Sequence, residues 1–81
     1  MRFRAEIVVS LRRGLLDPQG KAIEGALHTL GFPEVEHVRQ GKYIEIDVSE
    51  GDRATAKASV EAMCQKLLAN TVIENYEIEL G

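Results

Sequence analysis

The chain has 81 residues, enough for one domain, and we expect a single domain over residues 1–81. A domain of this size has a small core, and it is commonly stabilised by disulfides, a structural metal or oligomerisation. Cys64 is the only cysteine, which excludes an internal disulfide and a multi-cysteine zinc site. Oligomerisation is the remaining means of stabilising a domain of this size, so we expect a homodimer or a larger oligomer.

The formal net charge of −3 and the aromatic content, two tyrosines and two phenylalanines, argue against a nucleic-acid-binding protein. Such proteins need a basic surface and often use stacking rings. No apolar run approaches the roughly 20 residues that cross a membrane. The first residues, MRFRAEIVVSLRRG, lack the apolar core of a secretion signal, so we expect a cytoplasmic protein.

The first third of the chain predicts a strand followed by a helix. Residues 2–11 alternate between apolar and mainly polar side chains, as in a strand with one buried face. Asp17 is a suitable N-cap and Pro18 a suitable first helical residue, and Gly31 can end the helix. The apolar stripe of this helix comprises Ile23, Ala26, Leu27 and Leu30.

The remaining chain predicts three strands and a second helix. Residues 34–40 form a weaker strand pattern, Gly41-Lys42 a turn, and residues 43–48 a clear strand. A helix is expected over residues 53–69 and a last strand over residues 76–80. The stripe of the second helix comprises Ala56, Val60, Met63, Cys64, Leu67 and Leu68. The order β-α-β-β-α-β predicts a two-layer α+β fold, ferredoxin-like, with two helices on one face of a four-stranded antiparallel sheet.

No set of residues suggests catalysis, cofactor binding or metal binding by this chain. Cys64 lies on the apolar stripe of the second helix and is best interpreted as a core residue. His28 and His37 fall in different elements without a third ligand at metal-binding spacing. Neither a GxGxxG nor a Walker-type phosphate motif occurs.

The first helix contains glycines at positions 20 and 25, although an interior glycine costs a helix about 1 kcal/mol relative to alanine. Ala22, Gly25 and Thr29 are spaced to form a strip of small side chains beside the apolar stripe. A strip of this kind lets another chain approach closely. Gly20 lies in the first turn, where a side chain could obstruct a partner.

The same stretch resembles the PurS family, the small subunit of phosphoribosylformylglycinamidine (FGAM) synthase. The resemblance is carried by DPQGKA at residues 17–22, EGAL at 24–27, LGF at 30–32, VRQGKYIE at 38–45, MCQKLLAN at 63–70, VIE at 72–74 and YEIE at 76–79. It covers most of the chain, apart from residues 50–59, which carry no family motif.

The resemblance implies a subunit of a glutamine amidotransferase complex in purine biosynthesis. This ligase would use ATP and glutamine to convert formylglycinamide ribonucleotide to formylglycinamidine ribonucleotide. A PurQ subunit would hydrolyse glutamine, and a PurL subunit would hold ATP and Mg. The PurS subunit would join them and support ammonia transfer without catalytic residues or cofactors of its own. As the partner interface we expect Asp17, Gln19, Gly20, Lys21, Ala22, Gly25, Thr29, Arg39 and Lys42.

Two alternatives remain at this stage. One is a stand-alone dimeric domain that senses a small ligand in a polar pocket. The other is a small enzyme similar to the acylphosphatases, which place an arginine in a phosphate-binding loop after the first strand. Here Arg12-Arg13-Gly14 resembles that loop only faintly. Genes for a separate glutaminase and synthetase beside this one would favour the assembly subunit.

Overall fold

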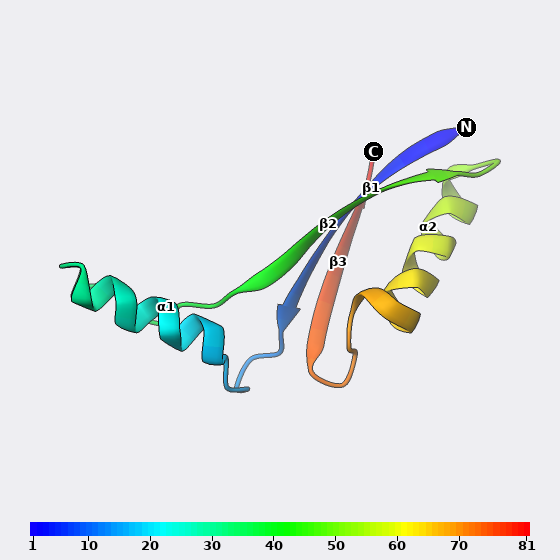
Figure 1. Cartoon of the computed structure of the whole chain (residues 1–81). Helices are drawn as coiled ribbons and strands as arrows, with labels where there is room; N and C mark the ends of the chain where they lie inside the picture. The colour runs from blue at the N-terminus through cyan, green and yellow to red at the C-terminus, as the bar shows by residue number, and fades with distance from the viewer.

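A computed structural model describes residues 1–81 and shows an α+β chain with three strands and two helices. The elements follow the order β1, α1, β2, α2, η1, β3 (Figure 1). Their bounds are Arg2–Leu11 for β1, Pro18–Thr29 for α1, Gly41–Ser49 for β2, Arg53–Met63 for α2, Cys64–Leu68 for the π-helical segment η1, and Glu74–Leu80 for β3.

The sheet is antiparallel in the order β2-β1-β3, with β1 at its centre. The alternation along β1 sets its inner face, because Phe3, Ala5, Ile7 and Val9 are all buried. Ile7 pairs with Ile44 on β2 and with Ile78 on β3, so apolar side chains lie on one face across all three strands. The alternation predicted for residues 2–11, 43–48 and 76–80 is confirmed.

Helix α2 covers part of the inner face by packing on β1 and β3. Asp52 caps its start, because its carboxylate accepts a hydrogen bond from the amide of Thr55 at 2.8 Å. Its α-helical turns end at Met63, and η1 adds one wider π-helical turn. That turn shifts the helical phase, so Leu67 is 83% exposed, whereas we expected it in the core.

Helix α1 forms over the predicted residues but does not lie on the sheet. Asp17 caps its start, and Gly31, with φ of +103°, follows its end. Figure 1 shows α1 extending away from the body, joined to the ends of β1 and β2. Gly20 is the only residue of the helix that is buried. The expectation of two helices on one face of the sheet is therefore wrong.

Residues 34–40 form no strand, which corrects the expected four-stranded sheet. His37 has φ of +58°, and a left-handed residue interrupts an extended chain. Gly41 and Lys42 do not form a turn, because β2 already includes both. A Cβ at Gly41 would overlap the carbonyl oxygen of Val9, so glycine permits β1 to approach closely.

The chain is elongated, with extents of 52 × 24 × 14 Å. Its radius of gyration is 16.3 Å, whereas a compact chain of this length would have about 12 Å. Its accessible surface is 5918 Å², against about 4,900 Å² for a compact monomer of equal mass. The position of α1 accounts for this shape and leaves a large surface exposed.

Candidate partner-binding surface

Cys64 and His28 are both engaged within the chain's own structure. Cys64 is fully buried in the core, and burial raises the pKa of its thiol, so it stays protonated and unreactive. The ring of His28 donates through Nε2 to the carbonyl of Val35 at 2.7 Å. No group of three or more His, Cys, Asp or Glu residues could hold a metal ion. None of the helices combines the length and apolar character needed to span a bilayer.

Asp17 holds the start of α1 against the segment that leads into β2. Its carboxylate accepts one hydrogen bond from the amide of Gly20 and another from the amide of Gln40, both at 2.9 Å. These amides, that of Gln40 first, lower the pKa of Asp17 below its usual value of 3.8. Asp17 therefore joins the two connections that carry α1 and sets the direction in which the helix leaves the sheet.

Gly20 supports the same junction. A Cβ at this position would overlap the carbonyl oxygen of Val38 and lie 2.9 Å from Oδ2 of Asp17. The glycine is needed because the helix and residues 38–40 touch here within one chain. Its sequence-based interpretation as space for a partner is not required to explain it.

Three cationic residues near this junction bind the chain's own backbone. Arg39 donates to the carbonyl of Leu11, and Lys42 donates to that of Leu68 at 3.3 Å. Arg12 donates to the carbonyl of Thr71 at 2.6 Å. Arg12 thus joins β1 to the loop before β3, which argues against the phosphate-binding loop considered above.

The strip of small residues on α1 faces open space. Ala22, Gly25 and Thr29 are exposed, and no atom would lie within 4 Å of a Cβ at Gly25. The hydroxyl of Thr29 donates back to the carbonyl of Gly25 at 3.1 Å, so the strip presents few free polar groups. Gln19 and Lys21, also expected at an interface, are exposed on the first turn of the helix.

The apolar stripe of α1 is also unpacked, which the sequence analysis missed. Ile23 is 39% exposed and Leu30 is 72% exposed, and Phe32 just beyond the helix is 49% exposed. The sequence held no signal for this, because a helix facing its own core and one facing a partner show the same periodicity.

The inner face of the sheet has a matching gap over β2. Helix α2 packs on β1 and β3, and α1 adds no substantial contact with any strand. Ile44 and Ile46 contact the core from β2 but remain only partly buried. The apolar stripe of α1 therefore has no sheet packed against it, and the inner face of β2 has no helix packed against it.

The comparisons with known proteins decide the family. The family model described as "PurS: Phosphoribosylformylglycinamidine (FGAM) synthase" matches residues 4–81. The PurS subunit of FGAM synthase from Bacillus subtilis is 46% identical over 78 residues, covering 96% of this chain and 92% of the relative. The chain belongs to the PurS family. The resemblance found in the sequence is confirmed, and the chain is a subunit of FGAM synthase, a ligase of purine biosynthesis.

Solved structures of PurS proteins agree with the fold. A Bacillus subtilis PurS structure has a TM-score of 0.89 at 46% identity, covering 98% of each chain. A chain in the structure of PurLQS from Thermotoga maritima has a TM-score of 0.90 at 32% identity, covering 100% of this chain and 99% of that one. Membership of this family removes the stand-alone ligand sensor from consideration.

Proposed function

We propose that this PurS chain is the non-catalytic assembly subunit that joins a PurQ glutaminase to a PurL synthetase and supports ammonia transfer between them. The observation that carries the proposal is helix α1, whose apolar stripe is exposed at Ile23 and Leu30. In this proposal ATP and Mg bind to PurL, this chain binds no cofactor, and the complex is cytoplasmic. A relative named as part of PurLQS supports this assembly.

The proposal includes a homodimer in which the copies exchange α1. Helix α1 cannot cover its own β2, because Asp17 and Gly20 hold its first turn against residues 38–40. The α1 of a second copy could cover the partly buried Ile44 and Ile46. An isolated 12-residue helix is only marginally stable in water, and burial of its stripe would stabilise it.

This exchange would complete a ferredoxin-like arrangement between two chains. Such a fold places two helices on one face of a sheet, whereas here only α2 covers that face. A second copy would supply the missing helix over β2. The strip formed by Ala22, Gly25 and Thr29 would then remain beside the dimer contact, where PurL or PurQ could approach closely.

Reconstitution with the purified PurL and PurQ subunits tests the assembly role. With glutamine as nitrogen donor, we expect amidation of formylglycinamide ribonucleotide to require this chain. With ammonium chloride in place of glutamine, PurL should work without it, because no transfer between subunits is needed. Glutamine-dependent amidation at the full rate without this chain would contradict the proposal.

A further inference from the structure

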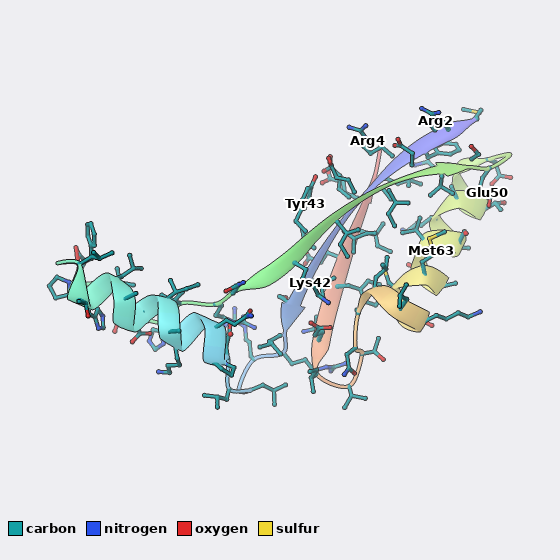
Figure 2. All side chains as sticks on the ribbon, in the orientation of Figure 1. Arg2, Arg4, Lys42, Tyr43, Glu50 and Met63 are labelled. Carbon is teal, nitrogen blue, oxygen red and sulfur yellow. The ribbon has the colours of Figure 1, made fainter.

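The second face of the sheet, turned away from α2, carries an unusual arrangement of charge. We define this open face as the outward residues of the three strands. Figure 2 shows two of them, Arg4 and Tyr43, on the side opposite α2. Its charged residues are Glu6, Glu45, Asp47, Glu77, Glu79, Arg2 and Arg4. Five carboxylates against two arginines give this face a net charge of −3.

Three of these carboxylates form one row across the sheet. Glu6 on β1 pairs with Glu45 on β2 and with Glu79 on β3. Side chains directly opposite on antiparallel strands have Cβ atoms about 5 Å apart, and like charges in these positions destabilise a sheet. The ion pairs of the chain are Arg4–Asp47 and Lys42–Glu74, so none of the three carboxylates in the row takes part in an ion pair.

The neighbouring row joins two exposed side chains with apolar surface, Val8 and Tyr43, to a further carboxylate, Glu77. Val8 is 48% exposed and its partner Tyr43 is 58% exposed, and both line a shallow hollow with Glu6, Glu77 and Glu79. The hydroxyl of Tyr43 donates to Glu45 at 3.2 Å, which holds the ring beside the carboxylates. Partial burial, Glu45 and Glu6 raise the pKa of this phenol. An apolar centre bordered by charge has the composition of a protein interface.

We propose that the open face is the docking surface for a cationic surface of a partner subunit, PurL or PurQ, with an arginine or lysine seated on the Tyr43 ring among Glu6, Glu77 and Glu79. A cation on an aromatic face gains from the ring, and the carboxylates supply its counter-charge. This inference rests on the proposed assembly function and adds the surface and the charge of the partner.

The charge pattern excludes the other occupants. Nucleic acid and anionic lipid would be repelled by the carboxylates. A second copy in a two-fold contact through the centre of this face would set the Glu45–Glu6–Glu79 rows of the two chains together, which repeats the repulsion. The contact also differs from the proposed α1 exchange, which uses the inner face of the sheet.

The test compares two double variants of the full chain, each bound to purified PurL and to purified PurQ. The test variant Glu6→Gln/Glu79→Gln removes two charges of the row. The control Glu36→Gln/Glu61→Gln removes two exposed charges outside the sheet, so both variants have the same net charge. Affinity is measured by calorimetry, and thermal unfolding of each free chain is followed in parallel.

We expect the test variant to bind one of the two subunits at least about tenfold more weakly, while the control binds like the wild type. The free test variant should unfold at an equal or higher temperature, because the repulsion in the row is relieved. Wild-type affinity should fall as the salt concentration rises from about 0.05 to 0.3 M, and the test variant should respond less. The single variant Glu45→Gln should shift affinity and stability in the same directions.

The following results would contradict the proposed docking surface. Equal affinity of the test variant and the wild type, or equal weakening in test and control, would overturn the docking surface while leaving assembly intact. Wild-type affinity that does not change with salt would also overturn it. If the wild type bound neither subunit, the proposed assembly function would fail together with this inference.

Discussion

At the residue scale, the two glycines of α1 serve different purposes although both weaken the helix. Gly20 is buried against the carbonyl of Val38, whereas Gly25 faces open space. From the sequence alone, both glycines were predicted to lie at a partner contact. Only the approach of residues 38–40, which are distant in sequence, distinguishes Gly20, which the fold requires, from Gly25, which faces open space.

Alanine at these positions should therefore have opposite effects on stability. Gly20→Ala should lower the free energy of unfolding by about 1–3 kcal/mol, because its methyl group would overlap Val38. Gly25→Ala should raise it by up to about 1 kcal/mol, because alanine favours helix and meets no atom. Urea denaturation of both variants measures the difference.

Gly25→Leu extends this comparison to assembly. It should remain folded, because the space above Gly25 is open, and it should weaken association by filling the strip between Ala22 and Thr29. Sedimentation and binding to PurL and PurQ measure the effect. Unfolding of Gly25→Leu, or unchanged association of the folded variant, would show that the strip does not serve a partner.

At the element scale, local sequence signals predicted β1, β2, β3 and the extent of α1. The position of α1 depended on contacts between residues that are far apart in the sequence. The strand β1 could be predicted because its alternating pattern depends only on one face being buried. The Asp17 cap could be predicted from the residue type at the start of the helix. The expected strand over residues 34–40 was wrong because its valines are three residues apart and His37 has a left-handed backbone. The π-helical turn of η1 carried no sequence signal, so the exposure of Leu67 was not foreseen.

The Asp17 junction should give α1 a specific dependence on pH. The folded-state pKa of Asp17 lies below 3.8, so its contribution to stability is present above that value and is lost as pH falls through the folded pKa. Asp17→Asn keeps one oxygen acceptor but cannot accept from both Gly20 and Gln40. The variant should be less stable than the wild type at neutral pH, and the difference should shrink in acid.

Thermal unfolding of both proteins from about pH 7 to pH 2 measures this difference. Asp52 also has a lowered pKa, chiefly from the amide of Thr55, but it is present in both proteins and cancels. A constant gap between wild type and Asp17→Asn over this range would contradict the assigned role of Asp17.

At the scale of the whole molecule, surface area and shape point to a chain completed by association. The accessible surface exceeds that of a compact monomer by roughly 1,000 Å². Two copies that each buried such an area would form an interface in the range of stable complexes. The two faces of the sheet then have different roles in our proposals, since the inner face accepts a second copy and the open face accepts a cationic partner.

If two copies exchange α1, stability should depend on protein concentration. Association with the folded state stabilises it by mass action, so the Tm should rise between about 1 and 100 µM protein. Ile23→Asp is the matched control, because Ile23 is partly exposed on the stripe and lies outside the buried core of the chain. This variant should sediment as a monomer and unfold at a lower Tm that does not change with concentration. A wild-type Tm independent of concentration, with a monomer throughout the range, would show that α1 has no second copy as its partner.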